Sequence, residues 1–267
     1  MSELSKAVEG SEFERRRLAA RRLERVPARR GRRRHPLPVL IADLDPASIA
    51  TEAYRTLRAN LEFMRTDPPC RNVAVTSPTA GAGKSTTAAN LAIVAAQSGW
   101  RVCLVDADFR RPVLHEVFGL PNTGGLATVL ENGVPLHSVA RDTTFENLSL
   151  IVSGRDGPGF PQDLFTSQRL QKVMGEASNH FDLVLYDTPP VISVADAVNV
   201  AALCDGVIMV VRSGSVSSNV LQHAVRQITQ VNGRILGVLL NQVDLRRGDD
   251  DVYRYYRAYY NKNSKRQ

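Results

Sequence analysis

A strand-loop-helix segment between residues 73 and 96 constrains the fold more than any other part of this sequence. Val73–Thr76 is an apolar run typical of a buried strand, Ser77–Thr87 is rich in small residues and contains Gly83-Lys84-Ser85, and Ala88–Ala96 is an apolar stretch typical of a helix. This order of elements is that of a phosphate-binding loop. Small residues allow backbone N–H groups to surround phosphate oxygens, and the N-terminus of the helix adds partial positive charge.

The loop predicts a site for ATP and Mg²⁺ in a nucleotide-hydrolysing or phosphoryl-transferring protein. Lys84 is expected to reach the β- and γ-phosphates, and Ser85 can ligate Mg²⁺. The other expected nucleotide contacts come from the same loop and the first turn of the helix, namely Ala80, Gly81, Ala82, Gly83 and Thr86.

Three aspartates stand at the ends of two further apolar runs. Asp106 and Asp108 follow Arg101–Val105, and Asp187 ends Phe181–Asp187. Because ligands of open α/β sheets bind at the carboxyl ends of the strands, we expect these side chains beside the phosphate loop. Asp187 would hold Mg²⁺ directly or through water, Asp106 would ligate Mg²⁺ or accept a hydroxyl proton, and Asp108 would support it. The expected metal ligands are Ser85, Asp106 and Asp187, and the expected catalytic residues are Lys84, Asp106, Asp108 and Asp187.

Apolar runs and helical patterns alternate through the middle of the chain, and most of the runs are continuously apolar. Such strands are buried on both faces, as in a parallel sheet covered by helices. We therefore predict a doubly wound α/β fold with a mostly parallel sheet, the Rossmann-like three-layer architecture of P-loop NTPases. The predicted strands are 72–77, 101–106, 148–152, 181–187, 206–211 and 234–241, and the predicted helices are 46–65, 84–98, 164–178, 195–203 and 219–231.

The net charge of +7 belongs to the N-terminal arm. Residues 1–40 hold 12 basic and 5 acidic residues, whereas the two kinds balance in the rest of the chain. We interpret residues 1–44 as a basic, disordered arm and linker, 45–245 as the P-loop domain, and 246–267 as a flexible tail. The arm is either simply solvated or an anchor for an anionic membrane surface. Specific nucleic-acid binding is not expected, because Phe13 is the one aromatic residue of the arm that could stack on a base.

Cysteine usage and hydropathy indicate the compartment. Cys70, Cys103 and Cys204 are too few and too far apart for a disulfide framework or a metal site. No apolar stretch reaches the roughly 20 residues that span a bilayer. We expect a cytoplasmic protein that lies at a membrane only through a partner or through surface charge.

Three nucleotide-binding stretches together resemble those of the bacterial tyrosine kinases of capsule and exopolysaccharide systems: Ser77–Thr87 (Walker A), Val102–Arg110 (Walker A′) and Leu183–Pro190 (Walker B). Residues 52, 55 and 58 fit the E-x-x-R-x-x-R oligomerisation motif of that family, as Glu52, Arg55 and Arg58. The resemblance covers roughly residues 45–260 and implies transfer of the ATP γ-phosphoryl group to tyrosine. It also implies a homo-oligomeric ring at the inner face of the cell membrane. The implied partners are a transmembrane activator or polysaccharide co-polymerase and a protein-tyrosine phosphatase.

The C-terminal tail fits this activity. Its tyrosines stand among arginines and aspartates with almost no aliphatic residues, so packing does not explain them. We expect a neighbouring subunit to phosphorylate them, and the added charge to favour dissociation of the ring. They are Tyr253, Tyr255, Tyr256, Tyr259 and Tyr260.

Alternatives stay open at several positions. Glu52 and Arg55 can pair within one helix instead of between subunits. Asn241 either contacts adenine, as in related P-loop ATPases, or is an ordinary strand-end residue, and Arg110 either steadies phosphate charge or lies at the surface. One rival function is a partition or cell-division-site ATPase, whose signature lysine would fall where Thr79 stands. The other is a non-catalytic ATP-binding regulator of a polysaccharide export complex.

Overall fold

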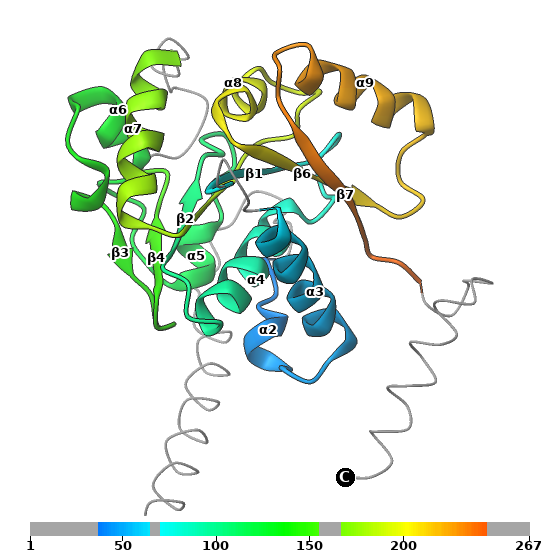
Figure 1. Ribbon diagram of the computed structural model, residues 1–267, viewed down its shortest axis with the longest axis horizontal. Coiled ribbons are helices and arrows are strands. Elements are labelled where there is room, and N and C mark those ends of the chain that lie inside the picture. Colours follow the sequence, from blue (N-terminus) through cyan, green and yellow to red (C-terminus); the bar gives the residue numbers. More distant parts are fainter. Residues whose placement is uncertain (1–36, 65–69, 155–166, 245–267) are drawn as a thin grey trace, which may run out of the picture. The chain divides into compact units, whose positions relative to one another are not determined.

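The computed structural model of the chain describes residues 37–64, 70–154 and 167–244 (Figure 1). These residues form a seven-stranded sheet with the strand order β3-β4-β2-β5-β1-β6-β7. Every neighbouring pair is parallel except β3 and β4, so the predicted doubly wound, mostly parallel sheet is confirmed. The strands are β1 (Asn72–Thr76), β2 (Val102–Asp106), β3 (Arg141–Asp142), β4 (Leu148–Ile151), β5 (Leu183–Asp187), β6 (Gly206–Arg212) and β7 (Ile235–Asn241).

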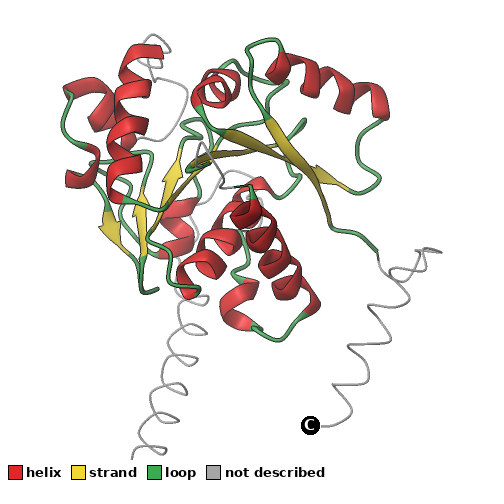
Figure 2. Cartoon of the chain, in the orientation of Figure 1, coloured by secondary structure: helices red, strands yellow, loops and turns green. Residues whose placement is uncertain are grey.

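Helices cover both faces of the sheet and complete the three layers (Figure 2). One core lies between the sheet and α6, α7, α8 and α9, and a second core lies between the sheet and α2, α3, α4 and α5. The helices are α2 (Ile41–Leu44), α3 (Ile49–Phe63), α4 (Lys84–Gln97), α5 (Leu114–Phe118), α6 (Leu126–Asn132), α7 (Ser167–His180), α8 (Asp196–Leu203) and α9 (Ser218–Thr229), with a 3₁₀ turn η1 (Leu136–Ser138).

The two-sided cover explains why β2 is apolar up to its last residue. Cys103 and Val105 join the core under α6–α9, and Val102 and Leu104 join the core under α2–α5. Successive side chains of a strand point to opposite faces, so a strand covered on both sides needs apolar residues at every position. β1 and β5 are likewise buried along their whole length.

The predicted elements lie within a few residues of their expected ends. The helix expected at 46–65 spans Ile49–Phe63, because its cap is Ser48, whose hydroxyl oxygen accepts a hydrogen bond from the Thr51 N–H. The expected start of α7 at residue 164 lies outside the described residues. The short elements α2, α5, α6, η1 and β3 were not predicted, since a few residues carry too little periodicity to be recognised.

The packed body begins before residue 45, the expected start of the domain. Asn90, buried on α4, accepts a hydrogen bond from the Ala42 N–H (2.9 Å) and donates one to the Val39 carbonyl (2.7 Å). The stretch around α2 is therefore packed on the domain, although we expected a linker there. The rest of the arm and the expected tail, 246–267, lie outside the described residues.

The three cysteines differ in burial. Cys70 and Cys103 are buried, whereas Cys204 is partly buried. Within the described ranges, no helix combines the length and the apolarity needed to cross a bilayer.

Candidate active site

The phosphate loop connects β1 to α4 and depends on two glycines. Gly81 (φ 80°) and Gly83 (φ 93°) have left-handed backbone conformations, which residues with a Cβ rarely adopt. Gly83 is the N-cap of α4, so the helix begins at Lys84, as predicted. Lys84 and Ser85 therefore stand in the first turn, where N–H groups without intrahelical acceptors attract anions.

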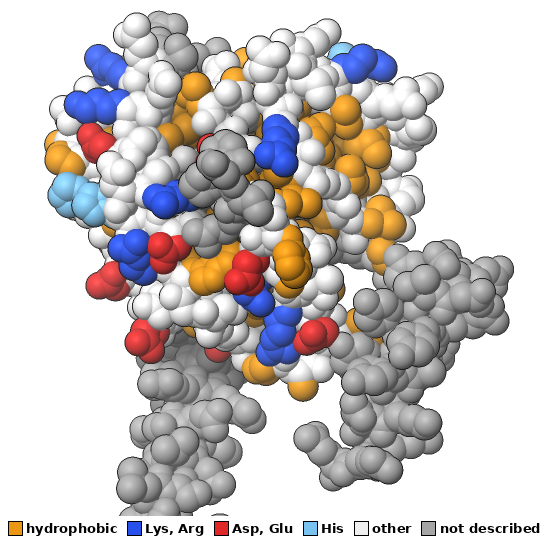
Figure 3. Space-filling view, viewed as in Figure 1, with side chains coloured by type: hydrophobic (Ala, Val, Ile, Leu, Met, Phe, Trp, Pro, Cys, Tyr) orange, Lys and Arg blue, Asp and Glu red, His pale blue; other side chains and the backbone are white. Residues whose placement is uncertain are grey.

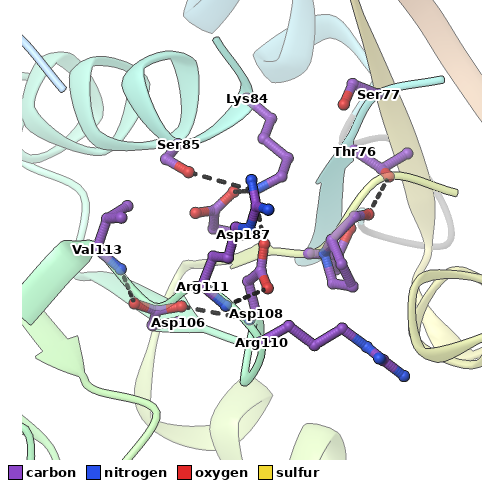
Figure 4. A network of polar contacts seen from close by, with 12 residues as sticks. Thr76, Ser77, Lys84, Ser85, Asp106, Asp108, Arg110, Arg111, Val113 and Asp187 are labelled. Carbon is purple, nitrogen blue, oxygen red and sulfur yellow. Dashed lines mark hydrogen bonds and ion pairs between the residues drawn. The ribbon is translucent and has the colours of Figure 1, made fainter. Parts of the chain in front are cut away.

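Three adjacent strands bring the predicted side chains together (Figure 4). The phosphate loop follows β1, Asp187 ends the neighbouring β5, and Asp106 ends β2 on the far side of β5. Asp106 and Asp187 are register partners in the sheet. The Lys84 ammonium lies 3.0 Å from Asp108 Oδ2, 3.6 Å from Asp187 Oδ1 and 3.4 Å from the Ser85 hydroxyl oxygen.

The charges of this cluster shift the pKa of Lys84. Burial lowers the pKa of the ammonium, but the negative charges of Asp187 and Asp108 outweigh burial and raise it overall. Lys84 is therefore a firmly charged cation at the mouth of the loop, as a phosphate ligand must be.

Asp187 is the carboxylate that best fits a metal ion. It is completely buried, and apart from the 3.6 Å ion pair between Oδ1 and Lys84 its oxygens make no hydrogen bond within 3.5 Å among the described residues. Burial raises its pKa to about 6, and the nearby Lys84 ammonium and Ser85 hydroxyl partly offset that effect. A buried carboxylate with open oxygens beside a serine hydroxyl suits Mg²⁺, which binds one or two protein oxygens together with phosphates and waters. Within the described part of the chain, no cluster of three or more His, Cys, Asp or Glu that could hold a metal ion occurs.

Asp106 is held by backbone groups. Its Oδ2 accepts hydrogen bonds from the Val113 and Leu114 N–H groups, both at 3.1 Å, and its Oδ1 accepts one from the Asp108 N–H at 3.3 Å. Burial, and then the charge of Asp187, raise the pKa of Asp106 well above its usual range. Asp106 thus shapes the loop from β2 to α5 while retaining a high affinity for a proton.

Asp108 and Arg110 face different partners. Asp108 uses Oδ2 for Lys84 and Oδ1 to accept the Arg111 N–H at 3.0 Å. Arg110 points away from the cluster (Figure 4), and its Nε lies 3.6 Å from Asp196 Oδ2 at the start of α8. In this structure Arg110 therefore links the loop after β2 to α8 and does not contact the Lys84 cluster.

Two threonines that we did not single out from the sequence connect the two strands, β1 and β5, that end at the site. The Thr188 hydroxyl donates to the Val75 carbonyl (3.1 Å), and the Thr76 hydroxyl donates to the Pro189 carbonyl (2.9 Å). The two bonds join the ends of β1 and β5 and so fix Asp187 relative to the phosphate loop. Both threonines are completely buried at strand ends, where an apolar residue would be the usual choice; this is the signal that could have identified them.

The residues predicted for subunit contacts, Glu52, Arg55 and Arg58, lie on α3, and acidic and basic side chains gather on this part of the surface (Figure 3). Arg55 pairs with Glu52 at 2.9 Å, and Arg58 pairs with Glu62 at 2.7 Å, so both arginines have partners within the helix. The side chains of Glu52 and Arg55 are both more than 40% exposed and remain available to a second subunit. The predicted phosphorylation sites, Tyr253, Tyr255, Tyr256, Tyr259 and Tyr260, lie outside the described residues.

Comparisons with known proteins concern the family and the fold. A family profile described as an AAA domain matches residues 70–240. The septum site-determining protein MinD of Pyrococcus horikoshii OT3, solved with Mg-ADP, is 22% identical with a TM-score of 0.55, and the match covers 70% of this chain and 76% of that one. At this identity the likeness to MinD concerns the fold alone.

Tyrosine kinases are more similar in sequence. The kinase domain of Escherichia coli tyrosine kinase ETK superposes with a TM-score of 0.74 at 30% identity, covering 84% of this chain and 87% of the other. The tyrosine-protein kinase YwqD of Bacillus subtilis (strain 168) is 36% identical over 217 residues, which are 81% of this chain and 90% of YwqD. Since both matches span most of each partner, the chain belongs to the family of bacterial tyrosine-protein kinases.

Proposed function

We propose that this chain is an ATP-dependent tyrosine autokinase that phosphorylates the tail of a neighbouring subunit. Through that reaction it regulates the polymerisation and export of a capsular polysaccharide or exopolysaccharide. The observation that carries the proposal is the position of the Lys84 ammonium at the start of α4, within 3.6 Å of two buried carboxylates. The acceptor is suggested by the tail, since five of the seven tyrosines of the chain stand between residues 253 and 260.

Nucleotide binding uses the loop and its cation. Lys84 exchanges Asp108 for oxygens of the β- and γ-phosphates, while backbone N–H groups of residues 80–86 surround the phosphates. Ser85 and Asp187 would hold Mg²⁺, either directly or through water, and Asp106 stands beside them as a further candidate ligand. Bound there, Mg²⁺ supplies positive charge that offsets the negative charge of the triphosphate.

Phosphoryl transfer then needs an acceptor oxygen and a base. The tyrosine oxygen forms a bond to the γ-phosphorus as the bond from that phosphorus to the β,γ-bridging oxygen breaks, and ADP leaves. The hydroxyl proton passes to Asp106, whose raised pKa gives the carboxylate a high affinity for a proton. Asp108 supports this step by donating its N–H to Asp106 and by orienting Lys84.

The proposed kinase assembles into a ring and acts with two partner proteins. Glu52, Arg55 and Arg58 would form the contact between subunits of a ring. Each phosphate adds about −1.5 to −2 charges to a tail, and repulsion among tails favours dissociation of the ring. A protein-tyrosine phosphatase would reverse the change. A transmembrane activator or polysaccharide co-polymerase would hold the kinase at the inner face of the cell membrane.

Autolabelling tests the reaction. The purified full chain is incubated with Mg²⁺ and γ-labelled ATP, with and without the cytosolic segment of a candidate activator, and phosphorylated residues are mapped by mass spectrometry. We expect phosphotyrosine at residues 253–260 in the native chain and none in Lys84→Met. Lys172→Met, an exposed lysine on α7, is the matched control and should label normally. Release of phosphate without labelled protein would indicate an ATPase, and nucleotide binding with neither product would indicate a regulator.

The basic arm has its own test. Vesicles that contain anionic lipid are pelleted with the full chain and with a chain that lacks residues 1–36. Stronger pelleting of the full chain is expected if the arm binds the surface, because each Lys or Arg near it contributes about 1 kcal/mol. Equal pelleting would show that the arm is only solvated.

A further inference from the structure

Asn241, the last residue of β7, contacts the phosphate loop from a distance of 159 residues in sequence. Its side-chain Nδ2 donates a hydrogen bond to the backbone carbonyl of Ala82 at 2.9 Å. Ala82 stands between the two glycines with left-handed backbone conformations, at the centre of the loop. The sequence suggested either an adenine contact or an ordinary strand-end residue for Asn241, and neither suggestion included this bond to the phosphate loop.

The bond controls the direction of the next N–H group. The peptide between Ala82 and Gly83 is planar and trans, so its C=O and its N–H point in opposite directions. While Asn241 holds the Ala82 carbonyl, the Gly83 N–H is fixed on the side away from Asn241. A loop binds phosphate through N–H groups, and one reversed peptide would present a carbonyl oxygen to the anion instead.

This peptide needs such a restraint because glycine follows it. Gly83 accepts positive and negative φ at similar cost, so rotation of the peptide before it meets little steric resistance. The Asn241 amide also lies directly against Gly83, since a Cβ built on that residue would be 2.1 Å from Nδ2. The close approach and the hydrogen bond together select one orientation.

Asn241 is itself fixed on both sides. Its Oδ1 accepts the Gln242 N–H at 2.8 Å, and its backbone carbonyl accepts the Ser213 N–H at 2.9 Å. Gln242 has φ 54°, a left-handed conformation that a residue with a side chain holds only when its surroundings impose it. With both ends of the amide occupied, Nδ2 is directed at Ala82.

We propose that Asn241 is a positioning residue that holds the Ala82–Gly83 peptide in the orientation required to bind phosphate, whatever base the nucleotide carries. The proposal rests on phosphate binding by the loop, and so on the first step of the proposed function. It makes β7, at the edge of the sheet (Figure 1), a support for the nucleotide site.

The test compares ligands with and without a base. Calorimetry measures the affinity of ATP and of inorganic tripolyphosphate, each with Mg²⁺, for the native chain, Asn241→Ala and Val238→Ala. Val238→Ala is the matched control, because it shortens an exposed side chain of the same strand, β7, that takes no part in holding Asn241. Circular dichroism and the thermal midpoint show that each variant is folded.

In Asn241→Ala we expect about tenfold weaker binding of both ligands, the size of one lost hydrogen bond. We also expect a KM for ATP raised to a similar extent, with kcat within about twofold, because the restraint acts equally on bound substrate and transition state. Val238→Ala should bind both ligands like the native chain. Weaker binding of ATP with unchanged tripolyphosphate would identify an adenine contact and overturn the proposal, and so would unchanged binding of both. These outcomes do not depend on labelling of tyrosine, which tests the proposed kinase separately.

Discussion

Lys84 and Asp108 form an ion pair across the site, with Nζ 3.0 Å from Oδ2, the Asp108 side chain buried and the Lys84 side chain 13% exposed. A triphosphate that binds Lys84 has to compete with Asp108 for the same ammonium. The carboxylate also adds negative charge where the phosphates would lie. Asp108 therefore lowers the affinity for the nucleotide and makes its release easier.

Replacement of Asp108 by Asn should raise the affinity for ATP. We expect the Kd for ATP to fall about tenfold, because the neutral amide competes less for Lys84 and does not repel phosphate. Autolabelling should become slower, since the support for Asp106 is weakened. Titration with a fluorescent ATP analogue measures the first effect, and Glu146→Gln, an exposed loop residue, is the control. Weaker ATP binding in Asp108→Asn would mean that Asp108 helps to hold the nucleotide.

Asp187 should make stability depend on pH. Its pKa is about 6 in the folded chain against a usual 3.8, so the folded state holds the proton more tightly than the unfolded state. Stability is therefore lost as the pH rises from about 4 to about 6, by up to about 3 kcal/mol for a shift of this size. Without nucleotide, Asp187→Asn should be more stable than the native chain at pH 8, and the difference should close toward pH 4. Urea unfolding at several pH values checks this, and a difference that is constant with pH would contradict it.

The same titration should affect ligand binding. Mg²⁺ binds the ionised carboxylate, so Mg-ATP affinity should decline as the pH falls through about 6. Asp187→Asn should bind Mg-ATP poorly at every pH. Calorimetry between pH 5 and pH 8 measures both effects, and an unchanged affinity of the native chain across this range would remove Asp187 from the metal site.

Gly83 and Gly175 offer a matched pair of glycine substitutions. Gly83→Ala places a Cβ 2.1 Å from the Asn241 amide in a residue with φ 93°, so we expect loss of about 2 kcal/mol or more of stability and loss of ATP binding. Gly175 lies inside α7 with no atom within 4 Å of an added Cβ. Gly175→Ala should therefore stabilise the chain by about 1 kcal/mol and leave ATP binding unchanged. Thermal unfolding and nucleotide titration of both variants check the pair.

The outer side of α3 should control assembly and not folding. The combined variant Glu52→Ala, Arg55→Ala, Arg58→Ala should have a smaller mass by light scattering than the native chain. Its unfolding free energy should change by no more than about 2 kcal/mol, because the Glu52–Arg55 pair is exposed and Arg58, 22% exposed, loses only its pair with Glu62 and its contact with the Trp100 ring. Arg226→Ala on α9 is the control for loss of surface charge. An unchanged mass would confine these residues to the intrahelical pairs seen in the structure.

Local patterns predicted much of this fold. Continuous apolar runs identified the buried strands, and the glycine-lysine-serine sequence located the start of α4 at Lys84. The convergence of Asp106 and Asp187 followed from the rule that strand ends share one edge of a sheet. What the sequence could not supply was the strand order that places β5 between β1 and β2, because pairing depends on packing across the whole domain.

Contacts between distant residues were beyond prediction for the same reason. Asn241 reaches Ala82 only because β7 follows β6 at the sheet edge, and no local pattern encodes that bond. The hydrogen bonds from Thr76 and Thr188 likewise require two strand ends to be neighbours. Short elements such as α5 depend on contacts with distant parts of the fold. The Leu114 N–H at the start of α5 donates a hydrogen bond to Asp106 at the end of β2, and this bond exists only in the folded chain.

The bonds from Asn90 to residues 39 and 42 set a limit on how far the chain can be trimmed. A fragment that starts at residue 45, where the apolar pattern first becomes helical, would leave the buried amide of Asn90 with only the Thr86 carbonyl as a partner. It would also uncover the flank of the helix whose first turn carries Lys84. Shortened versions for crystallisation or assay should therefore start no later than residue 37, and a weak signal from a shorter piece would report damage to the helix and not the loss of a regulatory arm.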